Sequence, residues 1–255
     1  MVDFHMAPVP RRPALVSDGV RLFRGGRRGT GLHAPRKRPS YPPRRKKKQK
    51  HLGRADLDIL DTALAGSRQT YAPAARLWLW VGILTGLRPR EWEGASLDEE
   101  GLVLRVRNAK QTNGRANGTH RHLRLHRMTP DEQNAIRQMV DLVATSADFS
   151  LLYARVRKII WRTAKRCWPR RTQRPSLYSA RHQWAANAKR IYSKRVVAAL
   201  AGHASEETAG IHYARRSRGE SAHLPEPLEQ DIAAVRKPAK IPPFTPPTVQ
   251  ETDQG

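Results

Sequence analysis

The chain has 255 residues, which is enough for one domain or two small ones. It carries 48 lysines and arginines against 22 acidic residues, and this net charge of +26 favours a polyanionic partner, with nucleic acid first. Its single cysteine excludes internal disulfides and cysteine-based zinc sites and fits a reducing compartment. Because no apolar run is long enough to span a bilayer and no signal peptide is recognisable, we expect a cytoplasmic protein that does not bind membranes.

Proline and charge set the two ends of the chain apart from its middle. Of the 19 prolines, seven fall in residues 1–50 and seven in 221–255. The first 50 residues hold 15 basic and two acidic side chains, and close to their end lies the basic run Arg44, Arg45, Lys46, Lys47 and Lys48. Such a composition cannot bury enough apolar surface to offset its ordering entropy. We therefore expect 1–53 to be a disordered basic arm whose basic run binds DNA; a solubilising tail or a localisation signal is the alternative.

The part between the ends, residues 54–219, is predicted to fold as one domain that begins with helices. Leucines at 57, 60 and 64 follow a helical period. A second helix begins near Pro73 and ends near Gly86, and a short helix follows over 89–94.

Alternating sequence then predicts a small sheet, and the remainder returns to helices. The strands are expected over 101–107 and 119–126, paired across a loop rich in glycine and asparagine. Thr129 followed by a proline and two acids predicts a capped helix start. Further helices are expected over 150–168, 176–191, 193–202 and 205–216. The predicted class is α+β, mainly helical, with a small antiparallel sheet, and 220–255 is expected to add a short helix and a proline-rich tail.

Several aromatic and histidine side chains are expected to be structural. The tryptophans predicted to lie in the core are Trp78, Trp80, Trp161 and Trp168. The second strand is expected to place Leu123 and Leu125 on one face and a polar set on the other, namely His120, His122, Arg124 and His126. We interpret the polar face as solvated or facing DNA in preference to a metal site. No Gly-Lys-Ser/Thr phosphate loop occurs in the sequence, so we infer no ATP.

Two blocks of sequence carry residues suited to binding phosphate. Arg88 follows a Thr-Gly-Leu turn at a helix end, where its planar fork can face a phosphate, and Glu91 is close enough to pair with a nearby cation. Tyr178 and Arg181 are three residues apart and share one face of a helix. Each feature by itself also fits a surface ion pair or a packing residue.

A third block runs from Gly202-His203, at a helix end, to Tyr213 ten residues later. Arg215 and Arg216 follow Tyr213 closely and are candidate DNA-binding residues. A phenol has an ordinary pKa of about 10, and neighbouring cations can activate it as a nucleophile. A stacking or packing role is the alternative for this tyrosine.

Together and in this order, the blocks resemble the catalytic domain of the tyrosine recombinase, or phage integrase, family over residues 54–219. The resemblance implies a catalytic set with Glu91 as its supporting acid and Lys110 on the hairpin, and its members are Arg88, Lys110, Tyr178, Arg181, His203 and Tyr213. Tyr178 stands where the family usually has histidine, and the step from His203 to Tyr213 is one residue longer than the commonest spacing.

The resemblance also implies a function, which is to cut and rejoin DNA strands at specific sites through a 3′-phosphotyrosyl intermediate. Double-stranded DNA would be the partner, with self-association into a tetramer on synapsed sites, in the cytoplasm of a bacterial or phage-type system of DNA integration and mobile elements. The covalent bond conserves the energy of the broken strand, so no cofactor or metal is implied. The family usually carries a helical core-binding domain ahead of the catalytic one, and here the basic arm stands in that place. An accessory DNA-binding protein is therefore a possible partner, and a non-catalytic DNA-binding protein that keeps the fold is the alternative.

Overall fold

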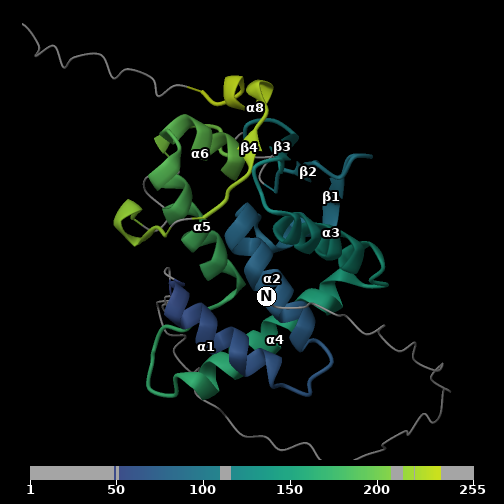
Figure 1. Cartoon of the computed structure of the whole chain (residues 1–255), viewed down its shortest axis with the longest axis vertical. Helices are drawn as coiled ribbons and strands as arrows, with labels where there is room; N and C mark the ends of the chain where they lie inside the picture. The colour runs from purple at the N-terminus through teal and green to yellow at the C-terminus, as the bar shows by residue number, and fades with distance from the viewer. Residues whose placement is uncertain (1–48, 50–51, 110–115, 208–214, 221, 237–255) are drawn as a thin grey trace, which may run out of the picture. The chain divides into compact units, whose positions relative to one another are not determined.

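The computed structural model describes residues 49, 52–109, 116–207, 215–220 and 222–236 (Figure 1). The helices are α1 (Arg54–Ala65), α2 (Ala72–Thr85), α3 (Pro130–Ala144), α4 (Phe149–Cys167), α5 (Leu177–Ile191), α6 (Lys194–Ala201) and α8 (Glu229–Ala233), with the 3₁₀ helices η1 (Pro89–Gly94) and η3 (Arg216–Arg218). The strands are β1 (Ala95–Leu97), β2 (Val103–Arg107), β3 (His120–Arg124) and β4 (Glu226–Pro227). The predicted class, mainly helical α+β with a small antiparallel sheet, is confirmed.

Helix α2 is central to the helical part of the fold because its sequence is apolar on nearly every side. Most of its residues are buried, and the helix packs against α1, α3, α4 and α5. Pro73 lies in its first turn and Gly86 ends it, as the sequence predicts. A helix surrounded in this way holds its last turn in a fixed place, and the segment that follows this turn carries Arg88.

The sheet has the order β1-β2-β3-β4, with every neighbouring pair antiparallel. On its buried face Leu104 lies opposite Leu123, and Val106 lies opposite Arg121. The sequence predicted only the two central strands. The edge strands β1 and β4 have three and two residues, which is too short for an alternating pattern to be recognised.

Helix starts and ends follow the sequence signals closely, with one correction. At the start of α3 the hydroxyl of Thr129 accepts a hydrogen bond from the N–H of Glu132 at 3.3 Å, and the Glu132 carboxylate accepts one from the N–H of Thr129 at 2.8 Å. The helix predicted over 205–216 does not reach its expected end, because Arg215 has an extended backbone with φ −69° and ψ 151°.

Trp161 corrects a second prediction, since it lies on the surface and not in the core. Helix α4 buries Val156, Ile160 and Thr163 on the face that packs against α1 and α2. Trp161 follows Ile160 by one residue, which turns it about 100° away from that face, and 55% of the residue is exposed. The Lys165 ammonium lies 5.5 Å from the centre of its ring.

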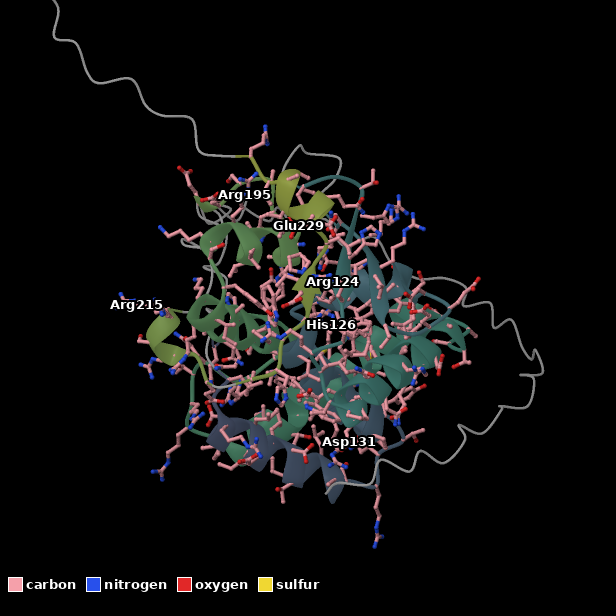
Figure 2. The ribbon with its side chains drawn as sticks, turned by 45° about the horizontal axis from the view of Figure 1, so that its top comes forward. Arg124, His126, Asp131, Arg195, Arg215 and Glu229 are labelled. Atoms are coloured by element: carbon pink, nitrogen blue, oxygen red, sulfur yellow. The ribbon has the colours of Figure 1, made fainter. Side chains whose placement is uncertain are left out.

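Described residues on both sides of 54–219 also pack onto the helices and the sheet. Leu52 is buried in the core. Strand β4 pairs with β3, and α8 packs against α6. Glu226 of β4 lies 3.2 Å from Arg124 and 3.3 Å from His126. Figure 2 labels Arg124 and His126. Within the described ranges, no helix is both long and apolar enough to cross a membrane.

Candidate active site

The turn after α2 has a backbone that only glycine suits. Gly86 has φ +66°, and its N–H donates to the carbonyl of Gly82 at 3.1 Å, which ends the helix. A Cβ at this position would overlap the Trp184 ring of α5. The Thr-Gly-Leu turn therefore lets α2 and α5 approach closely, and it places Arg88 directly before the first residue of η1.

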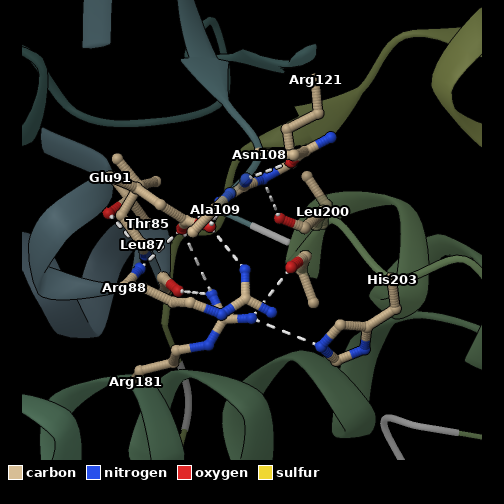
Figure 3. A network of polar contacts seen from close by, with 12 residues as sticks. Thr85, Leu87, Arg88, Glu91, Asn108, Ala109, Arg121, Arg181, Leu200 and His203 are labelled. Atoms are coloured by element: carbon tan, nitrogen blue, oxygen red, sulfur yellow. Dashed lines mark hydrogen bonds and ion pairs between the residues drawn. The ribbon is translucent and has the colours of Figure 1, made fainter. Parts of the chain in front are cut away.

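Glu91 of η1 brings three arginines from different elements together (Figure 3). Its Oε1 lies 2.5 Å from Nη1 of Arg88, and its Oε2 lies 2.8 Å from Nη2 of Arg121 and 3.8 Å from Nη1 of Arg181. Oε2 also accepts the N–H of Arg88 at 2.7 Å. Arg88 comes from the turn after α2, Arg121 from β3 and Arg181 from α5. The structure thus places both predicted arginines and the predicted supporting acid in one network.

The network is buried and its charge is positive. Arg121 and Arg181 are fully buried, Glu91 is 2% exposed and Arg88 is 8% exposed. Burial raises the pKa of Glu91, but the charges of Arg121, Arg181 and Arg88 outweigh burial and hold this pKa well below its usual range. Glu91 is therefore ionised, and the four charged side chains sum to +2, which favours an anion at this place.

Arg181 connects the arginine network to the end of α6. Its Nη1 donates to the Gly86 carbonyl, and its Nη2 donates to the Ala201 carbonyl at 2.9 Å. The same Nη2 lies 3.4 Å from Nε2 of His203. Because a guanidinium has only donors, Nε2 of His203 is the acceptor, which assigns the imidazole proton to Nδ1.

His203 is neutral, because burial and the charges of Arg181, Arg88 and Arg121 lower its pKa to about 2. Gly202, directly before it, ends α6 with φ +67°. A Cβ on Gly202 would overlap Oδ1 of Asn108. Packing thus requires glycine at position 202, and the residue after it places a neutral imidazole beside Arg181.

Tyr178 lies one turn before Arg181 on α5 and is half-buried. Its ring packs edge-on against His182, with ring centres 5.3 Å apart. The shared helical face of Tyr178 and Arg181 was predicted, and a role of Tyr178 as a donor to phosphate stays a prediction.

The remaining predicted residues lie in part outside the described ranges. Those outside are Lys110, Tyr213 and the basic run Arg44, Arg45, Lys46, Lys47 and Lys48. The N–H of Ala109, directly before Lys110, lies 3.4 Å from Oε1 of Glu91. The last described residue before Lys110 is therefore in contact with the arginine network. Arg215, which is labelled in Figure 2, and Arg216 are exposed. The 3₁₀ helix η3, which begins at Arg216, packs against α5.

Arg121 is the residue of the network that the sequence did not single out. Its Nε donates to the Leu200 carbonyl at 2.8 Å, and its Nη1 donates to Oδ1 of Asn108 at 2.6 Å. One signal was available, since the predicted alternation puts Arg121 on the same strand face as Leu123 and Leu125. An arginine on the apolar face of a strand indicates a buried charge with dedicated partners.

The described residues contain no group of three histidine, cysteine or acidic side chains that could hold a metal ion. His122, on the polar face of β3, instead faces Asp231 of α8. The Asp231 carboxylate accepts the N–H of His122 at 2.7 Å and lies 3.3 Å from its Nδ1.

Comparisons with known proteins give a structural similarity and no similarity in sequence. No protein-family model and no curated protein matches the sequence. The crystal structure of XerA recombinase is similar over 72% of this chain, with 20% sequence identity and a TM-score of 0.44. The chain spans 64% of the length of that XerA chain.

Proposed function

We propose that this protein is a tyrosine-type site-specific recombinase, which cuts and rejoins double-stranded DNA through a covalent bond between Tyr213 and a 3′-phosphate. One observation carries the proposal. Arg88 and Arg181, which are 93 residues apart in the chain, converge on Glu91 with His203 beside them. Their order in the sequence is the order in which the tyrosine recombinase family places its catalytic residues.

The chemistry of this cluster suits a phosphodiester. Guanidinium groups present planar, fixed donors that match phosphate oxygens, and their charge does not titrate near neutral pH. Attack on the phosphorus adds negative charge to the non-bridging oxygens, which Arg88 and Arg181 would stabilise with hydrogen bonds from His203 and Tyr178. A neutral His203 can donate its Nδ1 proton without adding a further positive charge. Preorganised donors of this kind contribute about 3–4 kcal/mol each to the rate.

The covalent step needs two residues outside the described ranges. The phenolic oxygen of Tyr213 passes its proton to solvent water and forms a bond to phosphorus, while the bond from phosphorus to the 5′-oxygen breaks. Lys110 donates a proton to the departing 5′-oxygen, which leaves as a free hydroxyl. Attack of a 5′-hydroxyl on the phosphotyrosyl bond reverses the step and releases Tyr213. Rejoining thus needs no ATP, and no metal takes part in the proposed steps.

The partners follow from this chemistry. Exchange between two duplexes requires four strands to be cut, so four copies of the chain would assemble on two synapsed sites. The exposed Arg215 and Arg216 and the basic run Arg44, Arg45, Lys46, Lys47 and Lys48 would contact phosphates outside the scissile position. An accessory DNA-binding protein would supply further contacts. We place the reaction in DNA integration by a mobile element in a bacterial or phage-type cytoplasm.

The test is a nicked suicide substrate made from DNA that flanks the gene. Cleavage beside the nick releases a short oligonucleotide that diffuses away, so the covalent protein–DNA adduct accumulates and separates on a denaturing gel. We expect an adduct with the wild type and none with Tyr213→Phe at unchanged DNA affinity. Tyr192→Phe is the matched control, because the Tyr192 hydroxyl lies 3.3 Å from the Leu224 carbonyl and has a structural partner.

Two results would contradict the proposal. An adduct that persists in Tyr213→Phe would move the nucleophile to another residue. Tight binding of the flanking DNA with no adduct in the wild type would favour the alternative, a non-catalytic DNA-binding protein.

A further inference from the structure

Arg121 is a fully buried charge on the core face of a strand. It lies opposite Val106 in the sheet and two residues before the buried Leu123. A guanidinium removed from water is stable only where its donors and its charge are matched by protein groups. The partners of Arg121 therefore indicate why this position holds an arginine.

Each of the three nitrogens of Arg121 donates to a different segment of the chain (Figure 3). Nη2 donates to Oε2 of Glu91 in η1 at 2.8 Å, and Nη1 donates to Oδ1 of Asn108 after β2 at 2.6 Å. Nε donates to the carbonyl of Leu200 in α6 at 2.8 Å. These segments hold the acid beside Arg88, the last residues before Lys110, and the helix that ends before His203. A single side chain thus ties together the three places from which the proposed catalytic groups emerge.

We propose that Arg121 is a positioning residue of the active site, which fixes Glu91, the base of the Lys110 hairpin and the end of α6 relative to one another without contacting the DNA phosphate. This inference rests on the proposed recombinase function. Arg121 acts through Glu91 on Arg88 and Arg181, and through Asn108 on the segment that carries Lys110.

The surroundings of Asn108 show how the hairpin base is held. Asn108 is buried, and its Nδ2 donates to Oδ1 of Asn117 at 3.1 Å and to the Gly118 carbonyl at 3.0 Å. These contacts close the two ends of the hairpin onto each other. A Cβ at Gly202 would overlap Oδ1 of Asn108 and would lie 2.9 Å from Nη1 of Arg121. The contact between Arg121 and Asn108 thus accounts for the glycine before His203 as much as the left-handed backbone does.

The electrostatic effects on His203 agree with a position of Arg121 that is farther from this residue than Arg181 and Arg88 are. Among the charges that lower the pKa of His203, Arg181 acts most strongly, then Arg88, then Arg121. Arg181 also contacts the His203 ring, whereas the three Arg121 donors go to Glu91, Asn108 and the Leu200 carbonyl.

The first experiment measures single-turnover cleavage by Arg121→Lys and Arg121→Gln on the nicked substrate at saturating protein. A displacement of about 1 Å at the reacting groups costs roughly 100-fold in rate, so we expect Arg121→Gln to be 10- to 100-fold slower. Arg121→Lys keeps the charge but cannot reach three acceptors at once, so it should recover only part of the rate. The DNA dissociation constant should stay within about threefold of wild type, because every group proposed to bind phosphate is retained. A fall in DNA affinity that matches the loss of rate would make Arg121 a phosphate ligand and overturn the inference.

A matched control separates positioning from general destabilisation. Arg76 makes two hydrogen bonds to Asp61, at 2.8 and 2.9 Å, and lies ten residues before Gly86 on the chain. Arg76→Gln therefore removes a partly buried ion pair between α1 and α2 away from the site. Its cleavage rate should equal that of wild type after both proteins are shown to be folded by urea denaturation. An equal loss of rate in Arg76→Gln and Arg121→Gln would reduce Arg121 to a structural role.

A second variant tests the link to Lys110 and does not depend on replacing the buried charge. Asn108→Ala removes the acceptor of Arg121 Nη1 and should misplace the hairpin. Its cleavage of ordinary DNA should slow, and a substrate with sulfur at the 5′-bridging position should recover most of the rate, because a thiolate leaves without a proton. Arg121→Gln should recover less on the same substrate, since it also disturbs Glu91. If Asn108→Ala is folded and cleaves ordinary DNA at the wild-type rate, the proposed link between Arg121 and the Lys110 hairpin is wrong.

A measurement that needs no DNA cleavage tests the positioning role of Arg121 independently of the proposed recombinase function. The ¹⁵Nε–¹Hε signals of Arg88 and Arg181 report how firmly the two guanidinium groups are held. We expect both signals to shift or broaden in Arg121→Lys, and inorganic phosphate to raise the melting temperature of this variant less than that of wild type. If the wild type forms no adduct, the recombinase proposal fails while this test still decides the positioning role. Unchanged signals and an unchanged phosphate effect would overturn that role.

Discussion

Replacing Glu91 by glutamine tests whether one carboxylate holds the arginine network together. The glutamine keeps the size of the side chain and removes its negative charge. Three guanidinium groups, those of Arg88, Arg121 and Arg181, then lie within one buried cluster with no carboxylate at its centre. Glu91→Gln should therefore destabilise the fold through repulsion and through the loss of charge-assisted hydrogen bonds.

The expected magnitude follows from the burial of the pair. The side chains of Glu91 and Arg121 are both fully buried and 2.8 Å apart, and removal of one partner from such a pair costs about 3–5 kcal/mol. The control is Asp61→Asn, whose partner Arg76 lies at the same 2.8 Å but whose own side chain is 38% exposed. Solvent screening limits that cost to about 0–1 kcal/mol.

The assay is urea denaturation of the wild type and both variants at pH 7, repeated at lower pH. The pKa of Glu91 is depressed in the folded state, so its stabilisation is fully present above its unfolded pKa of about 4.3. As the pH falls below that value towards the folded pKa, the unfolded chain takes up the proton first and the stabilisation is lost. The difference between wild type and Glu91→Gln should therefore be constant from pH 7 to about pH 5 and should narrow below it.

Inorganic phosphate gives an independent check of the same reasoning. An anion that binds the folded network restores negative charge, and it stabilises in proportion to the logarithm of its concentration over its dissociation constant. Phosphate should raise the melting temperature of Glu91→Gln at least as much as that of wild type. A cost for Glu91→Gln no larger than that for Asp61→Asn would refute the central role of this carboxylate.

Three further predictions concern the histidine, the lysine and the basic arm. The pKa of His203 is about 2 in the folded state and near 6.5 in the unfolded state, so the free energy of unfolding is highest above pH 6.5 and falls below that pH. From pH 7 to pH 5 the wild type should lose about 2 kcal/mol more of this free energy than His203→Gln does. Equal losses in the two proteins would indicate that the folded imidazole is charged. Lys110→Ala should slow cleavage of ordinary DNA, and a 5′-bridging sulfur should restore much of the rate if Lys110 is the acid. Deletion of residues 1–50 should weaken binding to all DNA sequences alike and flatten the slope of log affinity against log salt by about 0.9 for each phosphate that the arm neutralises, whereas an unchanged slope would leave the arm a solubilising or targeting tail.

The fold was predictable wherever a local signal decides the structure. The cap at Thr129, the left-handed stop at Gly86 and the apolar sequence of α2 act over a few residues, and the elements they predict are present. The same holds for β2 and β3, whose alternation extends over five residues each. The edge strands β1 and β4 carry no such signal, because they pair only once β2 and β3 offer their free edges.

Burial was less predictable than element type. Trp161 was expected in the core because of its chemistry, yet its position on α4 turns it to the surface. The helix expected over 205–216 does not include Arg215, whose extended backbone is not encoded by a proline or glycine at that residue.

For the candidate site, the residue types and their order along the chain could be read without a structure, and they include Arg88, Glu91, Arg181 and His203. Only the tertiary structure brought these residues together and revealed Arg121 as the fifth member of the cluster. The physical reason is that the role of a buried charge depends on the groups that it contacts. Those of Arg121 lie 30, 13 and 79 residues away along the chain, and no local pattern relates positions that distant until the helices and the sheet have packed.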